Sequence, residues 1–238
     1  MIMTTAEMKE TGLEAVTSQV ISSLRMLGDK YRREKSKTYF PTSLEVLGVS
    51  NPEVKTVISR LRISVGNREP RYYIDLAKML VATRIFECQH LAWVLFDQQK
   101  RMLEALEAED LPGLWGVQDN WASVDTFGVI LYGWMWRTGR INNAQVYKLQ
   151  ESPDVWERRL ALVACVALNT RSRGGTGDPE RTLYICERAV EDREDMIVKA
   201  LSWALRTLVQ WDREGVQEFL DRHREQLARR VKKEVQHK

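Results

Sequence analysis

The stretch NWASVDTFGVILYGWMWR, residues 120–137, has a long run of large apolar side chains at its centre. A run of this length and composition predicts a helix from Asn120 to Arg137 whose middle is buried. Nowhere does the chain alternate apolar and polar residues with period two over a useful length. We therefore expect helices and no sheet.

Other segments of the chain have a similar character. Only 6 of the 238 residues are Pro and 13 are Gly, which suits long helices better than a turn-rich β fold. Leu111-Pro-Gly is expected to be a break, and Arg171–Pro179 a flexible, glycine-rich loop. Further helices are expected over about 5–33 (with Gly28 a weak point), 51–65, 70–80, 83–107, 154–166, 179–191, 194–212, 215–223 and 225–235.

These helices come in pairs about every 30 to 40 residues, without a strict sequence repeat. That rhythm predicts an all-α, HEAT-like solenoid of antiparallel helix pairs, forming a single domain over residues 1–238. Such a solenoid would curve and offer a concave face to an extended partner. An irregular helical bundle is the alternative fold.

Cysteine and histidine usage argues against metal chemistry. The three cysteines are widely spaced without a CxxC pair, which suggests reduced, buried thiols in a cytoplasmic protein. The histidines are too scattered for a metal triad, so we expect no metal and no cofactor. The cysteines and histidines of the chain are Cys88, Cys165, Cys186, His90, His223 and His237.

The first 25 residues lack a signal-peptide pattern, and no apolar run could span a membrane.

Positive charge is concentrated in two segments, although the net charge is only +3. Arg25–Lys37 holds six Lys/Arg against two acids, or +4, and Arg222–Lys238 holds seven against two, or +5. The remainder is therefore 3 − 4 − 5 = −6. Such asymmetry can mark a surface for phosphates, or it can reflect two solvated helix faces.

Three helix starts place charged or aromatic residues in otherwise apolar helices: 119–125, 152–161 and 195–206. In the first, Trp121 and Asp125 are four residues apart and share a helix face. With these motifs the chain resembles the AlkD-like DNA alkylation repair proteins. Members of that family have a Trp-x-x-x-Asp helix start, a Trp-x-x-Arg helix and a Lys-Ala-x-x-Trp-x-Leu-Arg helix. The matching residues here are Trp121–Asp125, Trp156–Arg159 and Lys199–Arg206, in the same order.

The resemblance implies a DNA glycosylase that binds duplex DNA on its concave face. The expected reaction is hydrolysis of the N-glycosidic bond of cationic alkylpurines, such as 3-methyladenine and 7-methylguanine, in base excision repair. Trp121, Asp125 and Trp203 match the family's catalytic cleft, and Arg159 matches a residue that holds the DNA backbone. No lysine lies in a motif position suited to Schiff-base chemistry, so we expect a monofunctional hydrolase. The enzyme is expected to act as a monomer.

Other residues are candidates for contacts with DNA. Lys199 and Arg206 are either backbone contacts or structural residues, and Arg171 and Arg173 could reach phosphates from their loop. Arg159 could instead be half of a buried salt bridge. Trp134, Trp136, Trp156 and Trp211 are expected to be packing residues.

The match to the family is clear over about 115–212 and poor in the N-terminal half. Thr207 stands where members commonly have Glu, and Asn120 where an aromatic residue is frequent. Tyr31, Lys35, Lys37 and Tyr39 are the N-terminal candidates for DNA contacts. Two other functions stay open, because fold does not guarantee activity. They are a non-catalytic relative that binds DNA structures, and a helical scaffold for another protein.

Overall fold

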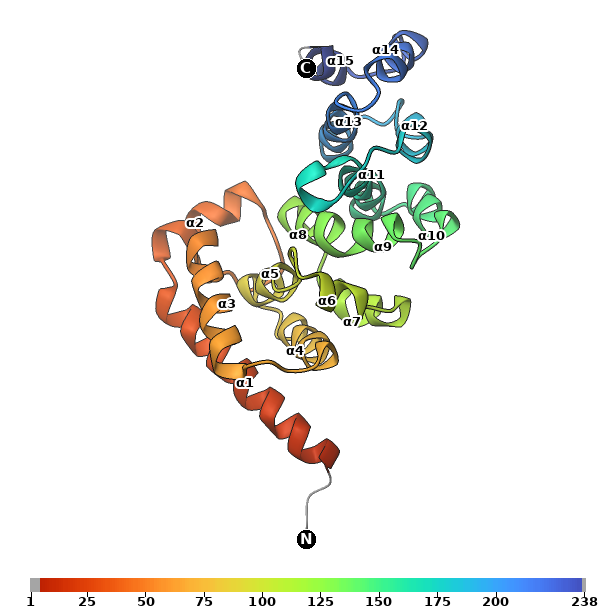
Figure 1. Cartoon of the computed structure of the whole chain (residues 1–238). Coiled ribbons are helices and arrows are strands. Elements are labelled where there is room, and N and C mark those ends of the chain that lie inside the picture. The colour runs from red at the N-terminus through yellow and green to blue at the C-terminus, as the bar shows by residue number, and fades with distance from the viewer. Residues whose placement is uncertain (1–4, 237–238) are drawn as a thin grey trace. The chain divides into compact units, whose positions relative to one another are not determined.

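The computed structural model describes the backbone of residues 5–236 and the side chains of residues 12–236. Helices dominate this part of the chain, and the only β pairing within it is an isolated parallel bridge between Glu45 and Ile85. The predicted all-α fold is confirmed (Figure 1). No helix between residues 5 and 236 combines the length and the apolar character needed to cross a bilayer.

The chain forms two compact units, residues 1–123 and 124–238. The helices of the first unit are α1 (Thr5–Leu27), α2 (Lys30–Tyr39), α3 (Asn51–Val65), α4 (Pro70–Ala82), α5 (Phe86–Val94), α6 (Lys100–Glu104), η1 (Ala108–Asp110) and α7 (Leu111–Trp115). Helix α8 (Trp121–Phe127) begins in the first unit and leads into the second. The second unit continues with η2 (Gly128–Tyr132), α9 (Gly133–Arg137), α10 (Asn143–Lys148), η3 (Leu149–Glu151), α11 (Val155–Asn169), η4 (Arg171–Arg173), α12 (Pro179–Glu187), α13 (Asp195–Leu208), α14 (Arg213–Arg222) and α15 (Arg229–Gln236).

The second unit is a stack of helix pairs. Helices α9, α11, α13 and α15 each pack on the next, while α10, α12 and α14 lie in a second layer beside them (Figure 1). Successive helices of the first layer run parallel: Arg159 near the start of α11 contacts Met196 near the start of α13, and Asn169 at the end of α11 contacts Trp211 just beyond α13. This is the order of a helical solenoid. Its HEAT-like character and a concave DNA face remain predictions.

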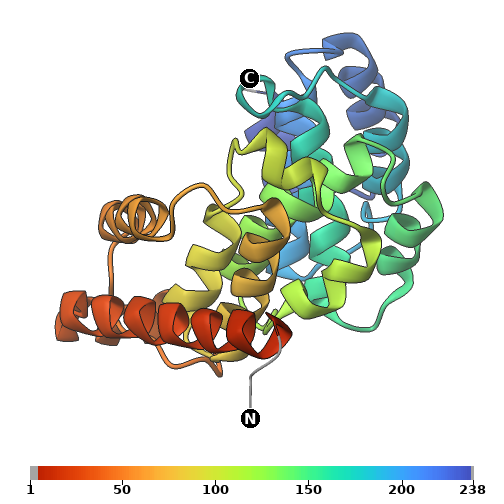
Figure 2. The same ribbon diagram turned by 60° about the horizontal axis from the view of Figure 1, so that its bottom comes forward.

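The first unit is built around α4, which packs on α1, α5, α6 and α7. Figure 2 shows α1 lengthwise, with later helices of the unit packed along one side. The core here includes the fully buried rings of Trp93 and Phe96. The Trp93 indole N–H donates to the carbonyl of Leu114, which satisfies its one polar group inside the core.

The predicted helix over 120–137 is confirmed as one continuous path through α8, η2 and α9, with η2 forming a π-helical turn. Two glycines allow α11 to approach it closely. A Cβ on Gly128 would lie 2.8 Å from Val163 Cγ1, and a Cβ on Gly133 would lie 2.6 Å from Ala167 Cβ. Such contacts leave no room for a side chain, so these glycines set how deeply the two helices pack.

The predicted single helix over 5–33 is wrong, because the chain breaks at Gly28 and Asp29. The Asp29 N–H donates to Leu47 O at 3.1 Å, and the Asp29 carboxylate then caps α2 by accepting from the Arg32 N–H. A tertiary contact with residue 47 thus restarts the helix. Helical periodicity continues across such a break, and in the sequence only Gly28 marked a weak point there.

Two other expected boundaries are also wrong. The predicted helix over 83–107 is divided into α5 and α6 by a turn in which Gln98 has a left-handed φ of 58°. The expected break at Leu111-Pro-Gly is instead the start of α7, where Pro112 occupies the first turn. Proline is tolerated there because the first N–H groups of a helix have no intrahelical partner.

Candidate functional site

Asp125 is paired with Arg159 inside the second unit. Arg159 Nε donates to Asp125 Oδ1 and Nη2 donates to Oδ2, both at 2.8 Å, so the two planar groups meet by parallel hydrogen bonds. The Arg159 side chain is 5% exposed and the Asp125 side chain 18%. The carboxylate is therefore fixed in orientation on a side chain that is not fully buried.

Arg159 also ties this pair to the next helix of the stack. Its Nη1 donates to the backbone carbonyl of Met196, in the first turn of α13. One guanidinium thus connects α8, α11 and α13, which fits its burial, since a buried charge needs several partners. In the structure Arg159 binds Asp125. That Arg159 also contacts the DNA backbone remains a prediction.

Burial raises the pKa of Asp125, while the hydrogen bonds and positive charge of Arg159 lower it; burial prevails, so the net pKa lies above the ordinary value of 3.8. A raised pKa makes a carboxylate a better proton acceptor in the range where it is still ionised. Asp125 therefore combines a fixed orientation with a shifted affinity for protons.

Helix α13 carries Lys199, Trp203 and Arg206, and all three side chains are half-buried. The two cations are partnered within the unit: Lys199 Nζ lies 2.6 Å from Asp195 Oδ2, and Arg206 Nη1 donates to Glu234 Oε2 at 3.1 Å. These ion pairs are partly exposed, so phosphate could compete for the cations. Their role in DNA binding stays a prediction.

Trp121 has its described contacts in the first unit. Its indole Nε1 donates to the carbonyl of Tyr39 at 3.0 Å, and its ring meets the rings of Tyr39 and Phe40 edge to face. The ring is half-buried, so part of it remains open to solvent. Trp121 and Asp125 both lie in α8, four residues apart, as the sequence predicted.

The glycine-rich loop that carries Arg171 and Arg173 is held by several contacts. The Arg171 guanidinium lies 4.3 Å from the centroid of the Trp211 ring, and Arg137 Nη1 donates to the Arg173 carbonyl at 2.7 Å. Gly177 packs its Cα against the Trp211 ring, where a Cβ would lie 2.7 Å from it. No sequence motif pointed to Arg137 as the residue that holds this loop. The exposed Arg171 side chain remains a candidate for phosphate contact.

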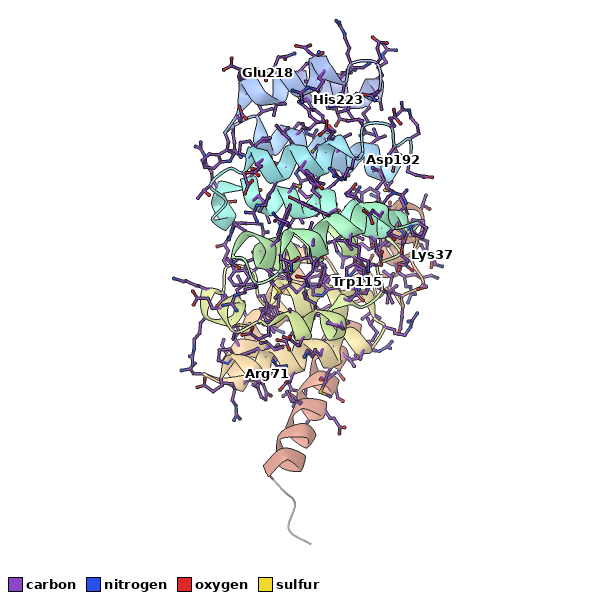
Figure 3. All side chains as sticks on the ribbon, turned by 90° about the vertical axis from the view of Figure 1, so that its right-hand side faces the viewer. Lys37, Arg71, Trp115, Asp192, Glu218 and His223 are labelled. Atoms are coloured by element: carbon purple, nitrogen blue, oxygen red, sulfur yellow. The ribbon has the colours of Figure 1, made fainter. Side chains whose placement is uncertain are left out.

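Helix α2 is the most polar helix in the first unit, with mostly exposed side chains and none that is buried. It carries five Lys/Arg against one acid, and Tyr31 and Tyr39 at its two ends are 75% and 64% exposed. Lys37, labelled in Figure 3, pairs with Glu34 on the same helix. Because α2 has no apolar side to bury, its charge and exposed rings fit a solvent-facing surface for phosphates.

The tryptophans expected to pack in the core behave in two ways. Trp136 is buried with its indole N–H on Asn143 Oδ1, and Trp211 donates its N–H to the Asn169 carbonyl. Trp134, Trp156 and Trp211 are half-buried. The cysteines at 88, 165 and 186 are buried free thiols, as expected. Within the described part of the chain, no three His, Cys, Asp or Glu side chains gather in a group that could hold a metal ion.

The chain matches a known protein family. The sequence model of a protein family described as DNA alkylation repair enzyme matches residues 20–236. No curated protein sequence matches the chain significantly. The family match includes the three motif helices and extends into the N-terminal half, where residue motifs alone matched poorly.

Proposed function

The chain belongs to the DNA alkylation repair enzyme family, and on that premise we propose that it is a glycosylase that removes cationic alkylpurines from duplex DNA. The substrates we propose are bases such as 3-methyladenine and 7-methylguanine, and the reaction is hydrolysis of the N-glycosidic bond without metal or cofactor. The single observation that carries this proposal is the carboxylate of Asp125, which Arg159 holds in one orientation on a side chain that is 18% exposed.

In the proposed reaction, water attacks C1′ of the deoxyribose and the bond from C1′ to the purine nitrogen breaks. The electron pair of that bond passes to the base, which leaves as a neutral purine, and the water loses a proton. Positive charge develops on the sugar in the transition state. A carboxylate held beside it stabilises that charge, an effect on the order of 3 kcal/mol, or about a hundredfold in rate.

Arg159 supports this role by holding Asp125. An ionised carboxylate has about four lone-pair positions, and Arg159 uses one on each oxygen. The others can face the sugar or orient the attacking water. A carboxylate whose position is set before substrate arrives needs no rearrangement during the reaction, which is the condition for effective electrostatic catalysis.

The indoles of Trp121 and Trp203 have half-buried rings and matching motif positions. In the proposal, each attracts the cationic base or sugar through its electron-rich face, by about 0.5–2 kcal/mol. The exposed cations of α2, together with Arg171, Lys199 and Arg206, supply phosphate contacts, which carry most of the affinity of proteins for DNA.

Base release from a duplex that carries a single 7-methylguanine tests the proposal. We expect the wild type to release the base and Asp125→Asn to release it at least tenfold more slowly, with duplex affinity nearly intact. Asp192→Asn is the matched control, because Asp192 (Figure 3) is also 18% exposed and also pairs with an arginine, Arg158. That variant should keep the wild-type rate.

Two other outcomes would point elsewhere. Tight, salt-sensitive binding without base release would favour a non-catalytic protein that binds DNA structures. No salt-sensitive binding at all would favour a scaffold for another protein.

A further inference from the structure

In the first unit, the start of α8 is joined to the segment Tyr39–Ser43 by the side chain of Asp119. The Thr42 hydroxyl donates to Asp119 Oδ1 and the Ser43 N–H donates to Oδ2, both at 2.6 Å. Asn120 Nδ2 donates to Oδ1 as well, at 3.1 Å. Asp119 thus connects the start of α8 with Thr42 and Ser43, which lie 77 and 76 positions before it in the sequence.

The same segment holds the ring of Trp121, two residues after Asp119. The Tyr39 carbonyl accepts the indole N–H at 3.0 Å, and the Tyr39 ring meets the indole at 90° with centroids 5.1 Å apart. Phe40 also meets the indole edge to face, and its own ring is stacked on Phe86 with centroids 4.5 Å apart. The orientation of the indole therefore depends on where residues 39–43 lie, as well as on α8.

The contacts of Asp119 are not needed to start α8 or to hold the rest of the loop. Asn120 caps the helix, since its Oδ1 accepts the Ser123 N–H at 2.9 Å. Glu87 fastens the later part of the loop by accepting the N–H groups of residues 47–49. The contacts that only Asp119 makes are its hydrogen bonds with Thr42 and Ser43. These two residues closely follow Tyr39 and Phe40, which contact Trp121.

The charge state of Asp119 fits this grip. Burial raises the pKa of its carboxyl, but the hydrogen bonds from Thr42, Ser43 and Asn120 together outweigh burial, so the net pKa lies below the ordinary 3.8. The group is therefore an ionised acceptor at neutral pH, and its hydrogen bonds with Thr42 and Ser43 are charge-assisted.

We propose that Asp119 is a positioning residue for Trp121: by clamping Thr42 and Ser43 to the start of α8, it fixes the angle of the indole that would hold the cationic base or sugar. This inference rests on the proposed glycosylase function for the role of Trp121. The attraction between a cation and a ring depends on the cation lying over the ring face, so a rotated indole would lose it. Small displacements of such groups slow a reaction markedly.

The first test measures the indole itself. In ¹⁵N-labelled protein, the indole N–H signal of Trp121 is assigned by its loss in Trp121→Phe. We expect its exchange with water to speed up at least fivefold in Asp119→Ala and in Thr42→Val, because the bond to Tyr39 O is loosened. Thr42→Ser keeps the hydroxyl and should exchange as wild type. The Trp93 indole, bonded to Leu114 O in the core of the same unit, is the internal reference.

Unchanged exchange at Trp121 in both Asp119→Ala and Thr42→Val would overturn the proposal, as would equal acceleration at Trp93, which would indicate general loosening of the unit. Thr42→Val replaces the hydroxyl, which also accepts the Leu44 N–H at 3.2 Å, with a methyl group of similar size, so it provides the test even if Asp119→Ala does not fold. This measurement needs no DNA and stands whether or not the protein is a glycosylase.

The second test uses single-turnover base release from the 7-methylguanine duplex. We expect Asp119→Ala and Thr42→Val each to slow release about tenfold while the duplex Kd changes less than about twofold. The double variant should be no slower than Asp119→Ala alone, because the two residues act through one contact. Additive losses would overturn the proposal. A wild type that releases no base would contradict the glycosylase function, and the indole exchange would still decide whether Asp119 positions Trp121.

Discussion

Arg159 meets Asp125 through two parallel hydrogen bonds of 2.8 Å, with the Arg159 side chain 5% exposed and the Asp125 side chain 18% exposed. The pair joins two helices of the stack, and a third bond to Met196 O joins a further one. Such a pair contributes to function mainly by fixing geometry, because the cost of burying two charges offsets much of their attraction. Disturbing it should therefore affect both stability and base release.

Arg159→Lys should lower the free energy of unfolding by about 2 kcal/mol, because lysine keeps the charge but cannot make the paired contact with Asp125. Urea denaturation measures this change. Arg158→Lys is the control, since the Arg158–Asp192 pair is less buried, at 19% and 18% exposed, and should lose less than about 1 kcal/mol. Equal losses in the two variants would contradict a special role for the Arg159 pair.

Base release should decline in acid, because Asp125 must be ionised to stabilise a cationic sugar. Since the pKa of Asp125 is raised, the acidic limb of the rate profile should lie above pH 3.8. Arg159 lowers this pKa against the effect of burial, so Arg159→Lys, with weaker contacts, should move the limb to still higher pH. Single-turnover rates across pH measure the shift, and a limb that moves downward would exclude Asp125 as the titrating group.

Gly133→Ala should destabilise the second unit by about 1–3 kcal/mol, because the added methyl would press on α11. Its Cβ would lie 2.6 Å from Ala167 Cβ and 2.8 Å from the backbone oxygen of Ala164. Gly12→Ala in α1 is the matched control, since nothing lies within 4 Å of its Cβ, and it should stabilise α1 by about 0.5–1 kcal/mol. Chemical denaturation measures the change in the free energy of unfolding in both variants, and we expect opposite signs. An unchanged free energy in Gly133→Ala would mean that the two helices can move apart at little cost.

Replacing Lys30 and Lys35 on α2 with serine should weaken duplex binding for any DNA sequence. If both lysines contact phosphates, the slope of log K against log salt should fall in magnitude by about 0.9 for each. Lys100→Ser, which removes an exposed lysine paired with Glu104 on α6, is the control for each single replacement, because it also removes one positive charge. A slope unchanged in the α2 variant, measured by titration at several salt concentrations, would remove α2 from the DNA-binding surface.

The amino-acid sequence by itself determined that the chain is helical, because scarce breakers and apolar runs such as 120–137 leave no competitive alternative to helices. Local signals in the sequence act within a few residues, and the structure shows two of them in the Asp154 cap of α11 and the Ser50–Glu53 capping box of α3. The motif spacing identified the family to which the chain belongs, and it predicted Asp125 as the catalytic carboxylate.

Only the tertiary structure decided which partners these residues have. Arg159 and Asp125 are 34 positions apart, and Asp119 and Thr42 are 77 apart, so no local pattern announces either contact. The break at Gly28 depends in the same way on the carbonyl of Leu47. Local sequence sets the secondary structure because its hydrogen bonds span a few residues, whereas a carboxylate finds its partner only after packing has brought distant helices together.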